Sequence, residues 1–165
     1  MSVILGNELP DRALNYLQVG RLVIMATVDE RGKPHTAPMS WVIAVDRSTI
    51  RIAISPNVNT YRNILNNDHV TLCLVGGGMT WSICGHAMVL SEAIEEVPFP
   101  MAMVEVHVDE VKDDSVIGRA IEGEALRWDD RLRAVSDIRV AQALRRAPVE
   151  SEFVSPLQPL PAADF

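Results

Sequence analysis

The sequence predicts a mainly β domain in which six antiparallel strands form a closed or nearly closed barrel with flanking helices. Three observations lead to this prediction. Runs of apolar and β-branched residues of strand length recur along the first 111 residues. Short polar or glycine-containing turns separate most of them, and these are too short for the crossover helices of a parallel sheet. A barrel also removes the exposed edges that so many strands would otherwise leave.

The chain has 165 residues, 48% of them hydrophobic, and this length fits one domain with a sizeable core. We expect this domain to span residues 1–147. Residues 148–165 contain Pro156, Pro159 and Pro161 and are expected to form an extended or loose tail.

The first half of the chain is predicted to be a short helix followed by a meander of strands. The helix is expected over residues 11–19, where apolar residues fall at helical spacing after Pro10. Strands are expected over residues 22–28, 34–45 and 49–55, because β-branched residues are frequent there and tight turns separate the segments.

The middle of the chain continues this pattern with one helix and two strands. The helix is expected over residues 61–66, with Asn59 or Thr60 as its N-cap. Strands over residues 69–75 and 80–90 are joined by three consecutive glycines, which favour a hairpin end.

Three further elements complete the prediction. Ser91 is expected to cap a short acidic helix over residues 92–97, and a sixth strand follows over residues 101–111. A C-terminal helix is expected over residues 128–146. Within the fifth strand, Gly85 indicates a bulge or a close approach of two backbones.

The net charge of −7 argues against a nucleic-acid-binding protein, which usually presents a basic face. The densest basic patch lies near the C-terminus, where aspartates accompany the arginines, so a solvated helix with intrahelical pairs is expected. The patch consists of Arg131, Arg133, Arg139, Arg145 and Arg146.

The sequence favours a cytoplasmic protein without a membrane segment. No apolar run approaches the length needed to span a bilayer, and the N-terminus lacks the basic and apolar regions of a secretory signal. The two cysteines, Cys73 and Cys84, form no disulfide framework and are expected to be thiols.

No metal site is expected, because the four histidines are widely spaced and nothing in the sequence indicates that they meet. The chain also lacks a nucleophile elbow, a P-loop and a dinucleotide-binding glycine motif. Hydrolase and phosphotransferase functions therefore have no residues to carry them. The histidines are His35, His69, His86 and His107.

Three segments, in order, resemble the FMN-binding split barrels of the pyridoxamine 5′-phosphate oxidase-like family. Residues 20–39 are similar to the family's first hairpin, with its acidic-Gly turn followed by Pro-His and Pro. Residues 52–70 are similar to its strand followed by an Arg-Asn-Ile-Leu helix, and residues 83–90 to its Gly-x-Ala strand. The resemblance covers about residues 20–111 and implies a six-stranded antiparallel split β-barrel of Greek-key type.

The resemblance also implies a homodimer that binds FMN between its subunits and acts on a small molecule. The ring edge is expected along the second strand, and the phosphate at the start of the helix that follows the third strand. Unpaired N–H groups and the positive dipole end at a helix N-terminus suit a phosphate. The implied residues are Pro38, Met39, Ser40 and Trp41 at the ring, Ile54, Ser55, Asn59, Thr60, Tyr61 and Arg62 at the phosphate, and Thr80 and Trp81 toward the partner subunit's flavin.

Two departures from the family pattern leave a second hypothesis open. Thr60 and Tyr61 stand where the family often has basic residues, so that Arg62, or Arg51 in the preceding strand, would have to supply the charge. The residues with which true pyridoxamine-phosphate oxidases hold their substrate have no counterpart, so that activity is not expected. The first hypothesis is an FMN-dependent oxidoreductase with no assigned acid or base. The alternative is a non-enzymatic dimeric module that has lost FMN or binds haem or another flavin-like cofactor.

Several of these residues also have ordinary structural interpretations. Ser55, Asn59 and Thr60 are typical turn and capping residues. Trp41 and Trp81 are suited to stacking on a flavin ring, but a tryptophan on a barrel strand more often belongs to a core or a dimer interface.

Overall fold

The computed structural model describes residues 2–18, 20–115 and 131–146, with the backbone alone for residues 131–137. In this part of the chain, eight strands form one sheet in which every pairing is antiparallel. The strands are β1 (Val3–Gly6), β2 (Val23–Val28), β3 (Pro34–Met39), β4 (Val42–Ala44), β5 (Thr49–Ile54), β6 (His69–Gly76), β7 (Met79–Ser91) and β8 (Ala102–Asp113). The helices are α1 (Asp11–Tyr16), α2 (Asn59–Asn66) and α3 (Arg131–Arg145).

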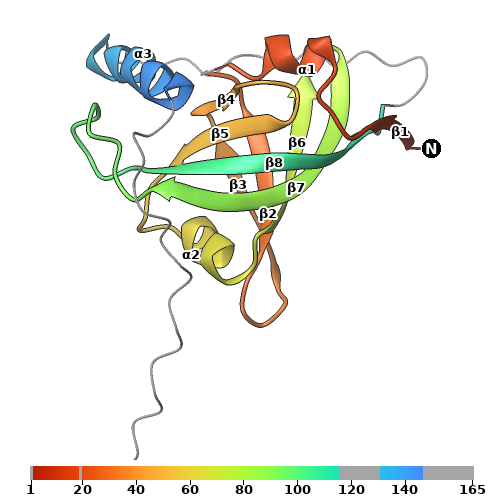
Figure 1. Ribbon diagram of the computed structural model, residues 1–165, viewed down its shortest axis with the longest axis horizontal. Coiled ribbons are helices and arrows are strands. Elements are labelled where there is room, and N and C mark those ends of the chain that lie inside the picture. The colour runs from red at the N-terminus through yellow and green to blue at the C-terminus, as the bar shows by residue number, and fades with distance from the viewer. Residues whose placement is uncertain (1, 19, 116–130, 147–165) are drawn as a thin grey trace, which may run out of the picture.

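The strands lie in the order β3-β2-β6-β7-β8-β5-β4, with β1 beside β8 and off this path. The sheet curls strongly, with α1 and α2 at opposite ends of the curl and α3 beside β4 (Figure 1). The prediction of a mainly β antiparallel split barrel is thus confirmed. None of the described helices has the length and apolar character required to cross a bilayer.

The described sheet has eight strands where the sequence predicted six, and the difference has two sources. First, β1 was not predicted, because its apolar residues are exposed and it is defined by its pairing with β8. Second, the strand expected over residues 34–45 divides into β3 and β4. At the division, the Ser40 carbonyl accepts a hydrogen bond from Gly20 N–H (2.9 Å), and the Trp41 carbonyl accepts one from Ala53 N–H (2.9 Å). The chain therefore turns from the β2 side of the barrel to β5.

Two hydrophobic clusters stabilise the fold. The larger one fills the inside of the curl, because alternate residues of β2, β6, β7 and β8 point inward, as the sequence pattern predicts. The smaller one lies between β4, β5 and α3. It contains Ile43, Ala53, Ile94, Val97, Met101, Met103, Val140, Ala143 and Leu144, with Trp41 and Leu90 packed against it. Strand β5 is therefore buried on both faces.

The acidic helix expected over residues 92–97 does not form. The Ser91 hydroxyl instead donates to the Ala93 carbonyl (2.6 Å) and accepts from Ala93 N–H (3.3 Å), which closes a local turn. Two prolines follow at once, and six residues are too few to repay helix nucleation. Burial of Ile94 and Val97 in the smaller cluster positions this loop instead.

Helix α2 begins earlier than predicted, at Asn59, and neither expected capping residue is its N-cap. That position belongs to Val58, which has extended backbone angles and provides no side-chain cap. Helix α1 ends at Tyr16, before the predicted end at residue 19. Helix α3 is described from Arg131 onward. Residues 128–130 of the predicted C-terminal helix and the tail expected over residues 148–165 lie outside the described residues.

Candidate functional site

Most of the residues expected to bind a cofactor line one hollow between β3, β5 and the start of α2. We call it the β3–β5 groove; its volume is about 390 Å³. Its lining consists of Ala37, Pro38, Met39, Ser40, Trp41, Ala53, Ile54, Ser55, Val58, Thr60 and Met101. Seven of the twelve expected residues are among them: Pro38, Met39, Ser40, Trp41, Ile54, Ser55 and Thr60.

The turn between β3 and β4 creates this groove. Strands β3 and β5 are not neighbours in the sheet, since β5 pairs with β4 and β8. The hydrogen bond from Ala53 N–H to the Trp41 carbonyl joins the chain after β3 to the C-terminal end of β5. The chain leaves β5 through Ser55, whose carbonyl accepts a hydrogen bond from Val58 N–H (3.3 Å), and enters α2.

The walls of the groove are suited to a flat, largely apolar ring with polar edges. Met39, Ile54 and Met101 are buried and provide apolar surface. Among the described residues, strand β3 ends the sheet and pairs with β2 alone, so one edge of its backbone has no strand partner there. Trp41 is half-buried and stacks on Phe99, with ring centroids 5.5 Å apart and planes inclined by 13°. Aromatic and apolar walls with a few polar backbone groups are typical of cofactor sites.

The start of α2 provides the polar end of the groove. The first N–H groups of a helix have no partner within the helix, and usually a Ser, Thr, Asp or Asn side chain satisfies one of them. At α2 the N-cap is Val58, which has no such side chain. These N–H groups belong to the segment that contributes Ser55, Val58 and Thr60 to the groove lining, at the positive end of the helix dipole. This arrangement is suited to an anion.

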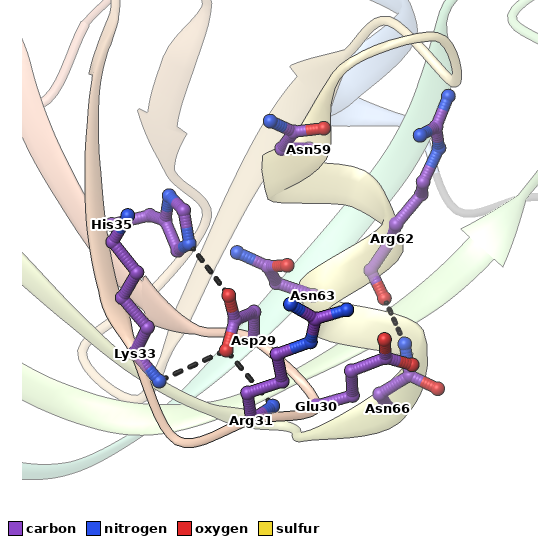
Figure 2. Close-up of a pocket in the computed structure, with 9 residues that line it drawn as sticks. All are labelled: Asp29, Glu30, Arg31, Lys33, His35, Asn59, Arg62, Asn63 and Asn66. Carbon is purple, nitrogen blue, oxygen red and sulfur yellow. Dashed lines mark hydrogen bonds and ion pairs between the residues drawn. The ribbon is translucent and has the colours of Figure 1, made fainter.

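Two other residues of the expected phosphate site, Asn59 and Arg62, line a second hollow beside α2. We call it the polar pocket; it has a volume of about 370 Å³ (Figure 2). The Arg62 side chain is exposed and extends toward the end of α2 that carries Asn59. Among the described residues its guanidinium has no ion-pair partner. The other lining residues are Asp29, Glu30, Arg31, Lys33, His35, Asn63 and Asn66.

Asp29 organises the β2–β3 hairpin that forms the far wall of the polar pocket. Its Oδ1 accepts hydrogen bonds from the backbone N–H groups of Arg31 and Lys33, both at 2.9 Å, and its Oδ2 lies 3.0 Å from His35 Nε2. The bond with His35, followed by that from Lys33, lowers the pKa of Asp29 from 3.8 to about 2. The ionised carboxylate therefore stabilises the hairpin.

We expect Asp29→Ala to remove a pH-dependent part of the stability. Because the folded pKa lies below the unfolded one, this part is fully present above about pH 4 and is lost as the pH falls toward 2. Thermal unfolding of both proteins between pH 2 and 7 checks this. The difference in Tm between wild type and variant should be constant near neutrality and shrink below pH 4. Glu30→Ala, at the neighbouring exposed position, serves as the control, and an equal effect there would contradict the assignment.

Three other expected residues lie away from both hollows. Tyr61 is buried in the larger cluster, where desolvation, and secondarily the Glu92 carboxylate, raises its pKa. Trp81 is 7% exposed and belongs to the same cluster, as its structural interpretation predicts. Thr80 is the second residue of β7, and its N–H donates to the Ser115 hydroxyl at 3.3 Å. Neither Thr80 nor Trp81 is among the residues that line the groove.

Arg51, the second expected source of positive charge, is engaged elsewhere. Its Nε donates to Glu105 Oε2 at 2.9 Å, and its Nη1 donates to the carbonyls of Leu144 (3.1 Å) and Arg146 (2.8 Å). Arg51 therefore holds the C-terminal end of α3 on the barrel, where cationic side chains commonly satisfy free carbonyls. It is not available for a ligand in the groove.

Sequence reasoning missed two features. Met101 lines the groove because β8 pairs with β5, with Ala102 opposite Ile54, and no local signal indicates that long-range pairing. The histidines expected to be dispersed also meet: His69 lies opposite His86, and His86 opposite His107. A signal for the first pair existed, since the three-glycine hairpin lies midway between His69 and His86 in the sequence.

The chain is similar in fold to several solved structures. A Lactobacillus delbrueckii protein provisionally named a pyridoxamine 5′-phosphate oxidase shares 24% identity over 66% of this chain and 97% of its own, with a TM-score of 0.58. An FMN-binding protein from Syntrophomonas wolfei shares 14% over 64% of this chain and 84% of its own, with a TM-score of 0.52. HupZ from Group A Streptococcus shares 21% identity over 62% of this chain and 90% of its own, with a TM-score of 0.51.

At these identities the likeness establishes the fold and nothing finer. Among curated proteins, none matches the sequence. The family model described as pyridoxamine 5′-phosphate oxidase, by contrast, matches residues 9–129, which is well over half of the chain and includes both hollows. This protein therefore belongs to the pyridoxamine 5′-phosphate oxidase family.

Proposed function

We propose that this protein binds FMN in the β3–β5 groove and uses it for oxidation–reduction of a small molecule. One observation carries the proposal: the groove joins the free backbone edge of β3 to the uncapped start of α2. A flavin mononucleotide has the same two parts, a planar ring with a hydrogen-bonding edge and a terminal phosphate. The FMN-binding protein from Syntrophomonas wolfei has the same fold, which supports the choice of this flavin.

In this proposal, the ring lies along residues 38–41, whose backbone groups hydrogen-bond its polar edge. The hydroxyls of Ser55 and Thr60 and the first N–H groups of α2 hold the phosphate. Arg62, exposed at the same end of α2, adds a charge-assisted bond. Flavin, when bound, supplies hydride or electron transfer. The described residues that line the groove include no acidic, basic or histidine side chain, so they act by binding, orienting and excluding water.

We further propose that the site is completed by a second copy of the chain. The lining of the groove is uncharged, and Thr60 and Tyr61 add no positive charge, so one protomer offers few groups to a phosphate dianion. Residues around Thr80 in a partner would supply the missing wall, as the family resemblance implies. Light scattering after size-exclusion chromatography should give twice the 18.2 kDa mass of the chain.

FMN titration of the purified protein tests the proposal. We expect saturable quenching of flavin fluorescence and a rise in Tm with added FMN, since a ligand that binds only the folded state stabilises it. Arg62→Ala should weaken FMN binding about tenfold, the low end for a lost charge-assisted hydrogen bond at an exposed position. Arg139→Ala, at an exposed arginine of α3, is the matched control and should leave the affinity unchanged.

The second candidate is a non-enzymatic module that binds another ligand, and the uncharged lining of the groove favours it. The same FMN titration distinguishes the two candidates. A dimer whose Tm does not respond to FMN, and which quenches no flavin fluorescence, would exclude FMN and support the module. Titration with haem or with other flavins would then identify its ligand. If the protein binds FMN but does not accelerate the reduction of FMN by reduced nicotinamides or other donors, the proposed cofactor is supported and the proposed enzymatic activity is contradicted.

A further inference from the structure

A row of polar, metal-ligating side chains crosses the outer face of the barrel on three neighbouring strands. His69 of β6 lies opposite His86 of β7, which in turn lies opposite His107 of β8. Their neighbours in each strand are buried, so these side chains share the solvent-facing side of the sheet. None of the three histidines is among the residues that line the β3–β5 groove.

Two of these histidines are close enough to share a ligand. Residues directly opposite each other on antiparallel strands have Cβ atoms about 4.5–5.5 Å apart. The rings of His69 and His86 lie with centroids 4.3 Å apart, at an angle of 51°. Asp68, which precedes His69, places its Oδ2 3.2 Å from His86 Nδ1. One ligand atom from each of Asp68, His69 and His86 lies within 4.8 Å of the others.

We propose that Asp68, His69 and His86 bind a divalent transition-metal ion of the zinc class. Zinc bonds to imidazole nitrogen and carboxylate oxygen are about 2.0–2.2 Å long, so ligand atoms around a tetrahedral ion are about 3.3 Å apart. The ligand atoms now lie within 4.8 Å of one another, so metal binding requires the side chains to rotate inward. Asp68 and His69 are exposed and His86 is half-buried, so the ion has direct access and the side chains can move.

The carboxylate of Asp109 strengthens this assignment because it orients the central ligand. Its Oδ2 lies 3.2 Å from His86 Nε2, on the other side of the ring from Asp68. If Nε2–H donates to Asp109, Nδ1 carries the lone pair toward the Asp68 carboxylate, and a cation between the two acceptors takes the place of the proton in that contact. A histidine that bonds a metal through one nitrogen usually donates its other N–H to a carboxylate or carbonyl. Asp109 is thus a positioning residue.

The donor set also determines the class of ion. Two imidazoles with one carboxylate favour Zn²⁺, Cu²⁺, Ni²⁺ or Co²⁺ over Mg²⁺ and Ca²⁺, which prefer an all-oxygen environment. Three protein ligands leave one position for water. The ion would join the loop after α2 to β6 and β7, where the Asp68 carbonyl already accepts a hydrogen bond from Ala87 N–H at 2.7 Å. The site is independent of the proposed flavin groove.

Isothermal titration calorimetry of the full chain with Zn²⁺, after treatment with EDTA, tests the proposal. We expect one ion per chain, a rise in Tm on binding, and reversal by EDTA. Loss of a metal-orienting partner typically weakens affinity about 10–100-fold, so Asp109→Asn should weaken it about tenfold and His69→Ala or His86→Ala by more. All three side chains are at least partly exposed, and the variants should unfold in EDTA at nearly the wild-type Tm.

Two controls complete the experiment. His107→Gln removes an exposed imidazole from the same face but outside the ligand set, and should change the affinity less than threefold. The double variant Cys73→Ser, Cys84→Ser removes the half-buried thiols, a residue type that also binds zinc, and should retain binding. Absence of Zn²⁺ binding, binding that survives His69→Ala and His86→Ala, or binding that is lost with the cysteines would overturn the proposal.

Discussion

Gly85→Ala is expected to destabilise the protein by about 3 kcal/mol or more, at the upper end of the cost of overpacking a close-packed interior. Gly85 follows a shift in the register between β7 and β8, and the backbones approach closely there. A Cβ at this position would lie against the His107 carbonyl oxygen, well inside van der Waals contact, and 3.0 Å from Val106 Cγ1. A backbone oxygen between paired strands moves only if the sheet deforms.

Thermal or urea unfolding measures this effect. For a chain of this size, about 3 kcal/mol corresponds to a loss of about 6–12 °C in Tm. Gly32→Ala is the matched control, because a Cβ there meets open space, although the backbone has φ of +77°. Its cost should be about 1 kcal/mol, from the left-handed conformation alone. Equal effects at both positions would show that the contact with His107 is not the cause.

Arg51→Met is expected to cost about 3 kcal/mol, because removal of one partner of a buried ion pair leaves the other without compensation. The Arg51 side chain is 11% exposed and that of Glu105 23%. The variant would leave the Glu105 carboxylate and the carbonyls of Leu144 and Arg146 without this donor. We expect α3 to detach, since Arg51 joins its C-terminal end to β5.

Unfolding in urea measures the total cost, and hydrogen exchange at residues 138–146 reports on α3 itself. Arg47→Met is the matched control, because Arg47 pairs with Asp11 at the surface, where both side chains are more than half exposed. Such a pair contributes about 0–1 kcal/mol. If Arg51→Met leaves exchange in α3 unchanged, Arg51 does not hold the helix.

The detachment of α3 also bears on the proposed flavin site. Leu144 and Val140 pack in the smaller cluster with Met101 and Ala53, and these two residues also line the β3–β5 groove. Trp41 likewise packs against the smaller cluster and lines the groove. Helix α3 therefore supports one wall of the groove from behind. Arg51→Met should weaken FMN binding without altering any residue of the groove, which distinguishes support of the wall from direct contact.

Local patterns in the sequence determined most of the strands and the residues that build the groove. The alternation in β2, β6, β7 and β8 records which side of each strand is buried, so these elements were predictable. The resemblance of about residues 20–111 to a known family then indicated residues 38–41 as the ring site, and Ile54, Ser55 and residues 59–62 as the phosphate site. Gly85 was recognised because glycine within a strand usually marks a close approach.

The tertiary structure alone decided which side chains meet. Arg51 lies in a strand like any surface arginine, and only the packing of α3, about 90 residues later, turns it into a buried capping residue. Tyr61 and Arg62 are adjacent in sequence, yet the helix directs one into the core and the other to solvent. His69, His86 and His107 form a row only through the registers of two hairpins. The physical reason is common to all: periodicity encodes burial, whereas contacts between distant segments depend on register and packing, which no local pattern specifies.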